Sequence, residues 1–174
     1  MRVLAIAGSL KARSSNRTVL EAARLLAPAG IEIVLFDRLG ELPLFNPDLD
    51  NDPPPPPIAD LRAAVGDADG LLICSPEYAR GVSAVLKNAL EWLVSSHEFP
   101  DKPVAVINAS QRSVDADGQL RLILRTMSAR LIERASITIP MLGRDPDARG
   151  LIENATLAEA LRQALMDFAE AITS

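Results

Sequence analysis

The residues best suited to chemistry form a polar, basic segment near the start of the chain. Between positions 8 and 17 the side chains include the hydroxyls of Ser9, Ser14 and Ser15, the amide of Asn16, and the cations Lys11, Arg13 and Arg17. A helix start adds unpaired backbone N–H groups and a positive dipole end. Cations there are unfavourable without a bound anion, so the segment predicts a phosphate site. An ordinary turn and helix cap, the alternative, leaves the cations unexplained.

The order of residues in this segment excludes two common phosphate motifs. A Walker loop requires Gly-Lys followed by Ser or Thr at a fixed spacing, and a dinucleotide-binding loop requires Gly-x-Gly-x-x-Gly. Neither pattern occurs between positions 8 and 17. A monophosphate such as that of FMN therefore fits better than a nucleoside triphosphate or a dinucleotide.

A second candidate segment follows the third apolar run, from Ser75 to Gly81. It holds Tyr78, the single tyrosine of the chain, directly after Pro76 and Glu77. In a loop, a tyrosine ring can lie along a flavin while the proline stiffens the turn. The alternative for one tyrosine is partial burial with its hydroxyl in water.

Strand-like and helix-like segments alternate along the chain. Apolar, β-branched runs predict strands at 2–7, 31–36, 69–74, 103–108 and 135–139. Three- and four-residue spacing predicts helices at 16–27, 58–66, 82–96, 116–132 and 157–172, the last opened by a Thr156–Glu159 capping box. The alternation predicts one α/β domain over residues 1–174, a three-layer sandwich with a parallel sheet between helices.

The strand patterns also predict the order of the strands in the sheet. The second and fifth runs alternate polar and apolar residues, as edge strands do, whereas the other runs are nearly continuously apolar. This pattern favours the flavodoxin-like order 2-1-3-4-5. Strands one and three are then neighbours, and the loops after them, 8–17 and 75–81, open at one switch point.

Both loops resemble those of the NADPH-dependent FMN reductase family. Gly8-Ser9-Leu10-Lys11 … Ser15-Asn16-Arg17 resembles the family's Gly-Ser-Leu-Arg … Ser-x-Asn loop, with Lys11 in place of Arg. The family's signature after strand three is matched by Pro76, Glu77, Tyr78, Leu86, Lys87, Asn88, Ala89 and Trp92. Ala79 stands where the family has Asn, and Ser83-Ala84 where it has Pro-Gly.

The resemblance implies an FMN oxidoreductase that takes hydride from NADPH or NADH and passes electrons to a quinone-like or flavin acceptor. The flavin carries the chemistry, and no side chain is expected to be catalytic. The expected cofactor-binding residues are Ser9, Lys11, Ser15, Asn16 and Arg17 for the phosphate, and Pro76, Glu77, Tyr78, Ala79, Arg80 and Ser110 for the ring. Arg80 or Arg112 is a candidate for contacts with the nicotinamide nucleotide.

Two other functions fit the same segments. A redox sensor or regulatory module would bind FMN without turnover; the Ala79 substitution and the lack of the family's Gly-rich loop after strand four favour it. A flavodoxin-like protein that has lost FMN would use the site for another phosphorylated ligand. Measurements of FMN binding and of NADPH oxidation distinguish these two functions from the reductase and from each other.

Composition excludes several other classes of protein. The net charge of −5, a pI near 4.9 and the lack of a basic run argue against nucleic-acid and membrane partners. A single cysteine, Cys74, and a single histidine, His97, argue against a metal site and a Ser-His hydrolase. No apolar run suffices for a signal peptide or a membrane span, so a cytoplasmic protein is expected.

Two segments suggest surfaces beyond the cofactor site. The helix expected at 82–94 is apolar on nearly every side, which predicts a homodimer or homotetramer through it. The segment 46–57 contains five consecutive prolines and reads as a stiff surface connection. The alternative is that it borders the ligand site, in its own subunit or a neighbouring one.

Overall fold

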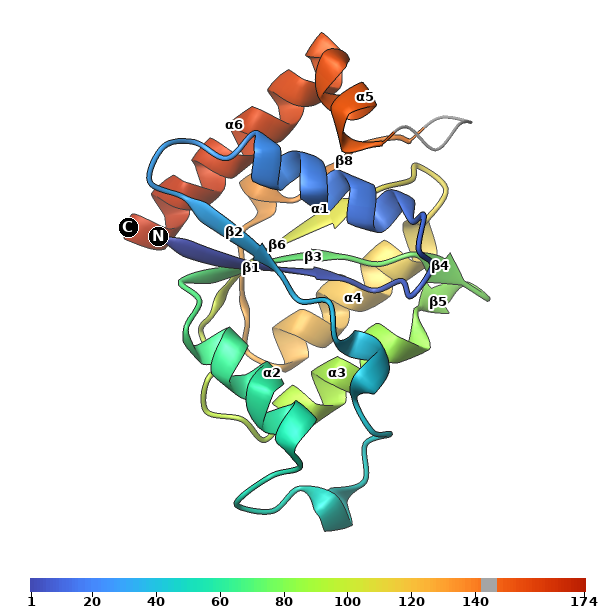
Figure 1. Ribbon diagram of the computed structural model, residues 1–174, viewed down its shortest axis with the longest axis vertical. Helices are drawn as coiled ribbons and strands as arrows, with labels where there is room; N and C mark the ends of the chain where they lie inside the picture. The colour runs from blue at the N-terminus through green and yellow to red at the C-terminus, as the bar shows by residue number, and fades with distance from the viewer. Residues whose placement is uncertain (142–146) are drawn as a thin grey trace.

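A parallel sheet forms the middle layer of the computed structural model, which describes residues 1–141 and 147–174. Its strand order is β2-β1-β3-β6-β7, the predicted 2-1-3-4-5 order of a flavodoxin-like fold (Figure 1). The strands are β1 (Arg2–Ala7), β2 (Glu32–Leu35), β3 (Gly70–Cys74), β6 (Pro103–Asn108) and β7 (Arg130–Leu131). β3 and β6 are buried along their whole length, because helices cover both of their faces.

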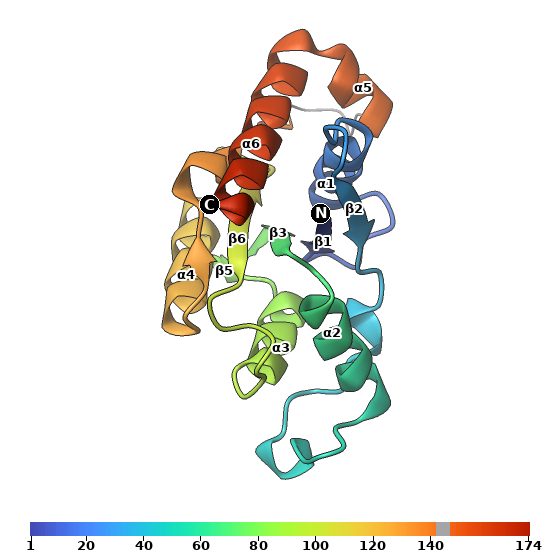
Figure 2. The same ribbon diagram turned by 90° about the vertical axis from the view of Figure 1, so that its left-hand side faces the viewer.

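Helices cover the two faces of the sheet and form two apolar cores (Figure 2). On one face lie α1 (Ser15–Leu25), α5 (Ala148–Glu153) and α6 (Ala155–Thr173), with Leu20 and Phe168 among the buried residues. On the other lie α2 (Pro56–Gly66), α3 (Ala84–Leu93) and α4 (Val114–Thr126), with Leu86 and Trp92 buried. Within the described residues, no helix combines the length and apolarity that crossing a membrane requires.

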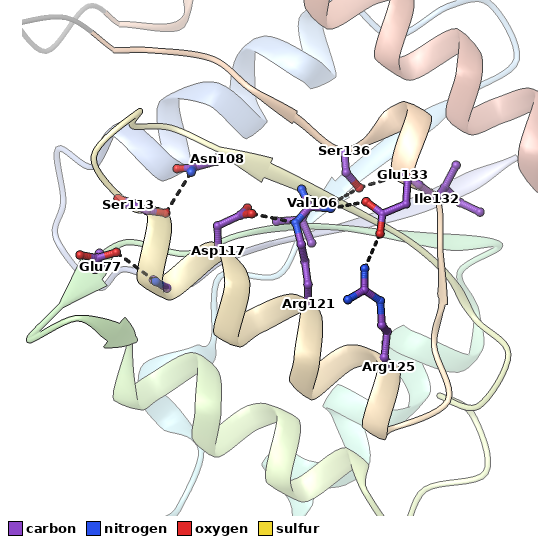
Figure 3. A network of polar contacts seen from close by, with 11 residues as sticks. Glu77, Val106, Asn108, Ser113, Asp117, Arg121, Arg125, Ile132, Glu133 and Ser136 are labelled. Carbon is purple, nitrogen blue, oxygen red and sulfur yellow. Dashed lines mark hydrogen bonds and ion pairs between the residues drawn. The ribbon is translucent and has the colours of Figure 1, made fainter.

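The fifth strand is divided: β8 (Ile137–Thr138) lies within the strand predicted at 135–139, whereas β7 at 130–131 was not predicted. Both β7 and β8 pair with β6, and a short 3₁₀ helix, Glu133–Ala135, separates them. The Ser136 hydroxyl accepts from the Val106 N–H at 3.0 Å and donates to the Ile132 carbonyl at 2.9 Å (Figure 3). A side chain thus replaces a backbone acceptor in the ladder, which strand periodicity does not reveal.

Several helix boundaries also differ from the prediction, two of them for a clear local reason. α4 ends at Thr126, so the expected helix to 132 runs too far, and Ser128 adopts a positive φ of 62° before β7. The capping box at Thr156 and Glu159 is wrong, because Asn154 caps α6 by accepting from the Leu157 N–H at 3.2 Å. Asparagine is among the best N-caps, so the helix begins earlier.

The apolar surface of α3 is mostly covered by its own chain. The segment after β2, with 3₁₀ helices at Leu39–Glu41 and Pro47–Leu49, packs against it. The Pro43 carbonyl accepts from Asn88 Nδ2 at 2.9 Å and Trp92 Nε1 at 2.8 Å, and the Phe45 ring meets the Trp92 ring edge-on. This cover explains most of the all-round apolar pattern that predicted a subunit interface.

Candidate functional site

The two predicted loops begin side by side, as expected. β1 and β3 end in register at Ala7 and Cys74, and the Gly8 N–H donates to the Cys74 carbonyl at 2.7 Å. A Cβ on Gly8 would lie 2.8 Å from Ser83 Oγ and 3.1 Å from Leu86 Cβ, so a larger residue does not fit between the loop and α3. The close approach of the backbone to α3 therefore requires glycine here.

The start of α1 offers a set of free hydrogen-bond donors. Ser14 is the N-cap, yet across the residues that the structure describes its hydroxyl makes no capping bond, and the first turn of α1 holds no acidic residue. The first-turn N–H groups, from Ser15 onward, have no partner within the helix. Ser9 Oγ accepts from the Lys11 N–H at 3.3 Å, which folds the loop back on itself.

The three cations of this loop differ in their surroundings. Within residues 1–141 and 147–174, no carboxylate lies within 4.0 Å of Lys11 or Arg13, and both are exposed. Arg17, in contrast, pairs through Nε with Glu21 at 2.8 Å and through Nη1 with Asp37. The hydrogen bond to Asp37 is the main cause that raises the pKa of Arg17. Two carboxylates already neutralise the Arg17 guanidinium, so these contacts do not favour the predicted role of Arg17 as a phosphate ligand.

Asn16 uses the oxygen of its side chain to join α1 to β3. The residue is buried, and its Oδ1 accepts from the thiol of Cys74 at 3.0 Å. Asn16 Nδ2 donates to no acceptor among the described residues, so both this amide group and the backbone N–H in the first turn remain for an anion. Burial raises the pKa of the Cys74 thiol, which agrees with its interpretation as a small buried apolar residue.

The loop after β3 contains a hairpin that the sequence did not predict. β4 (Glu77–Tyr78) and β5 (Gly81–Val82) pair antiparallel, Glu77 with Val82 and Tyr78 with Gly81. Ala79 (φ 49°) and Arg80 (φ 60°) occupy the two turn positions. Positive φ at both positions is typical of type I′ turns, which favour Asn-Gly, and each non-glycine residue in this region costs roughly 1–2 kcal/mol.

Helix α4 holds this hairpin at three points. The Glu77 carboxylate accepts from the Ala116 N–H at 3.0 Å (Figure 3), Arg80 Nη1 lies 3.0 Å from Asp115, and the Val82 N–H donates to Gln119 Oε1 at 2.7 Å. The Glu77 carboxylate and the Arg80 guanidinium are thus engaged with α4. The contacts that Glu77, Ala79 and Arg80 can offer a flavin therefore come mainly from their backbone.

Tyr78 and Pro76 remain as groups that can meet a ring. The Tyr78 side chain is well exposed, with 57% of its surface accessible, and Pro76 is half-buried. An exposed aromatic on a fixed hairpin provides a flat apolar surface with a polar tip. Asp115 and Gln119, which hold the hairpin, carry no sequence signal and were missed.

The turn after β6 closes on itself. The Asn108 Oδ1 accepts from the Ser110 N–H at 3.0 Å, and Ser110 Oγ accepts from the Arg112 N–H at 3.1 Å. Asn108 Nδ2 donates to the Ser113 carbonyl at 3.1 Å (Figure 3). The hydrogen bonds of Ser110 therefore stabilise this turn, which lies at the same edge of the sheet as the other two loops. Arg112, two residues later, is exposed.

The donor set at the start of α1 fits the monophosphate of FMN. The first-turn N–H groups, the serine hydroxyls and two cations that pair with no carboxylate among the described residues match a dianion with several acceptor oxygens. The hairpin with the exposed Tyr78 follows β3, the strand next to β1. The predicted residues Ser9, Lys11, Ser15 and Asn16 lie in the loop and first helical turn after β1, together with Arg13, and Pro76 and Tyr78 lie in the loop after the neighbouring strand β3.

Comparison with known proteins agrees with this geometry. The family described as NADPH-dependent FMN reductase matches residues 1–142. An NAD(P)H-dependent FMN reductase of Pseudomonas aeruginosa is 32% identical over 170 residues, covering 95% of this chain and 91% of the relative. A 2-hydroxy-1,4-benzoquinone reductase of Burkholderia sp. is 32% identical over 174 residues, covering 97% and 92%.

A solved structure shows the same fold over the full length. The flavoenzyme NAD(P)H:(acceptor) oxidoreductase FerB of Paracoccus denitrificans superimposes with a TM-score of 0.82 at 24% identity, covering 99% of this chain and 97% of that one. The matched family region contains both loops and the hairpin, and the relatives extend over nearly the whole chain. The chain belongs to the NADPH-dependent FMN reductase family.

Proposed function

We propose that the protein is an FMN-containing oxidoreductase that takes hydride from NADPH or NADH and reduces quinone-like, flavin or similar small acceptors. The observation that carries the proposal is the start of α1, whose hydrogen-bond donors and cations suit a phosphate. It lies after the strand next to the one that leads into the hairpin, which α4 holds and which carries an exposed tyrosine. The names of the Pseudomonas and Burkholderia relatives support the acceptor class, because they refer to FMN and to a benzoquinone.

The work is divided between cofactor and protein. When bound, FMN supplies hydride exchange at N5 of its ring. Ser9, Ser15 and the first-turn N–H groups of α1 bind the phosphate, and Lys11 and Arg13 balance its charge. The backbone of the hairpin and the Tyr78 ring orient the flavin. These residues bind and orient, which agrees with a site whose described residues include neither histidine nor an accessible cysteine.

Three measurements on the purified protein test the proposal. We expect a flavin visible spectrum with added FMN, oxidation of NADPH or NADH, and faster oxidation when a quinone is present. FMN binding without turnover over a range of acceptors would favour a redox sensor. No binding of FMN would leave a site for another phosphorylated ligand and would refute the proposal.

We further propose that the protein forms a homodimer or homotetramer. Although most of α3 is covered, Val94 at its end is 65% exposed, and Leu44, on the segment that packs on α3, is 83% exposed. Large apolar side chains exposed beside one helix favour burial against a second copy. Residues 1–174 would then form one FMN-binding domain of a cytoplasmic protein.

A further inference from the structure

We propose that Gln119, on α4, is a positioning residue for the flavin-binding hairpin, and that it replaces the stabilisation which turn residues give in an ordinary hairpin. The inference rests on the proposed function, because the hairpin would affect activity by orienting the flavin. It concerns a residue outside both sequence motifs.

The hairpin is too short and too poorly suited at its turn to stay ordered alone. Only two residue pairs join β4 to β5, and an isolated two-stranded hairpin is marginal in water even when longer. Its turn positions hold Ala79 and Arg80, both at positive φ, where Asn-Gly would be favourable. Contacts from outside the hairpin must therefore compensate for the turn.

The three contacts with α4 are not equivalent. Arg80 pairs with Asp115 at the tip, but the Arg80 side chain is 86% exposed, and an exposed ion pair contributes little. Glu77 acts on the first strand, where its carboxylate accepts from the N–H of Ala116 in the first turn of α4. Gln119 acts on the second strand, through the 2.7 Å bond from the Val82 N–H. Without Gln119, the second strand would keep the packing of Val82 on the apolar core but would lose its hydrogen bond to α4.

The fit around Gln119 is tight. A Cβ on Gly81 would lie 3.3 Å from Gln119 Oε1, so the glycine allows the amide to approach the strand. α4 is itself fixed to the sheet edge, since Arg121 and Arg125 both pair with Glu133 between β7 and β8 (Figure 3). The Val82–Gln119 bond thus joins the hairpin to an element with a defined position.

Preorganising a binding loop increases affinity by removing the cost of ordering it on binding. Loss of one hydrogen bond corresponds to a factor of about 3 to 10 in the local equilibrium. We therefore expect Gln119→Ala to increase amide exchange of the hairpin, Val82 above all, by about 3- to 10-fold in the protein without FMN. FMN affinity should fall by a similar factor. Alanine favours helix at this exposed position, so α4 itself should remain folded.

Two further variants separate positioning from a general structural effect. Gln119→Glu keeps an acceptor for the Val82 N–H and should retain most of the wild-type protection. Ala79→Asn provides a residue suited to positive φ, and in the Gln119→Ala background it should restore both protection and FMN affinity. Gln163→Ala, on α6, is the matched control and should change neither quantity.

The experiment is hydrogen exchange of residues 77–82 without FMN, followed by FMN titration of the same variants by flavin fluorescence. Unchanged exchange in Gln119→Ala would overturn the proposal, as would failure of Ala79→Asn to restore it. Changed exchange with unchanged FMN affinity would overturn the link to the flavin. Failure of the proposed function is distinguishable, because the wild-type protein would then bind no FMN while the exchange results remained readable.

Discussion

The thiol of Cys74, the last residue of β3, donates to Oδ1 of Asn16 in the first turn of α1 at 3.0 Å. This bond joins the two loops that sequence motifs single out, although 58 residues separate the partners. Both groups are buried, so each satisfies the other where water does not reach. The start of the phosphate-binding helix is therefore fixed to the strand that carries the hairpin.

Burial predicts that Cys74 is unreactive in the native protein. The thiolate is the reactive form, and burial raises the pKa of this thiol far above neutrality. We expect a thiol reagent such as DTNB at pH 8 to label the native protein only at the rate at which it unfolds, and to label it rapidly in denaturant. Rapid stoichiometric labelling under native conditions would contradict the buried placement.

The surroundings of the cations predict which of them bind the FMN phosphate. Lys11→Ala and Arg13→Ala should each weaken FMN binding by about 10-fold while changing riboflavin binding little, because a charge-assisted bond contributes roughly 1.5–3 kcal/mol. Arg17→Ala should have a smaller effect, since Glu21 and Asp37 already use that guanidinium. Flavin fluorescence quenching measures both ligands. A larger loss of FMN preference in Arg17→Ala would restore its role as a phosphate ligand.

The packing of Gly8 predicts a compensating pair of substitutions. Gly8→Ala should destabilise the protein by about 1–3 kcal/mol, because the new methyl group would overlap Ser83 Oγ and crowd Leu86. Ser83→Ala removes that oxygen, a buried hydroxyl that lacks a hydrogen-bond partner among the described residues. We expect the single Ser83→Ala variant to be neutral or stabilised, and the double variant to regain part of the loss. If the changes in unfolding free energy of the two single variants simply add up in the double variant, the predicted contact between position 8 and Ser83 does not exist.

Asp50 predicts a pH-dependent contribution to stability. Its carboxylate accepts from Ser95 Oγ and pairs with Arg62 at 2.8 Å, and the Ser95 bond is the main cause that lowers its pKa below the usual 3.8. A lowered pKa in the folded state gives stability that is present above pH 3.8 and lost as the pH falls through the folded value. Asp50→Asn should therefore cost about 1–2 kcal/mol at pH 7. The difference in unfolding free energy between Asp50→Asn and the wild type, measured by urea unfolding, should become smaller below pH 3.8. A difference that stays constant with pH would contradict this.

The exposed apolar residues beside α3 predict the effect of charge on self-association. Leu44→Asp and Val94→Asp should shift the protein towards monomer, because an interface does not tolerate a buried unpaired carboxylate. Leu25→Asp is the control, since Leu25 is a similarly exposed leucine on α1 on the opposite face of the sheet. Light scattering during size-exclusion chromatography gives the masses. Equal effects of all three substitutions would speak against this surface.

Sequence periodicity predicted the sheet order and the meeting of the two loops, because burial of β3 and β6 leaves a continuous apolar run in each. The hairpin at 77–82 was not predicted, because its turn residues Ala79 and Arg80 lack the sequence signal of a type I′ turn. Contacts with α4, which are distant in sequence, stabilise it instead. Helical spacing allowed the Arg17–Glu21 pair, but Asp37 reaches Arg17 only through the tertiary fold. The fifth strand is divided by a 3₁₀ turn, and the Ser136 hydroxyl accepts from Val106 there, neither of which strand periodicity indicates.

The divided strand has a consequence for solubility. An edge strand with a long row of free backbone groups is a template on which another chain can add a strand and aggregate. Here β7 and β8 contribute only two residues each, and a 3₁₀ turn displaces the chain between them. An incoming strand would find no continuous row of donors and acceptors, so the interruption protects the open side of the sheet from unwanted polymerisation.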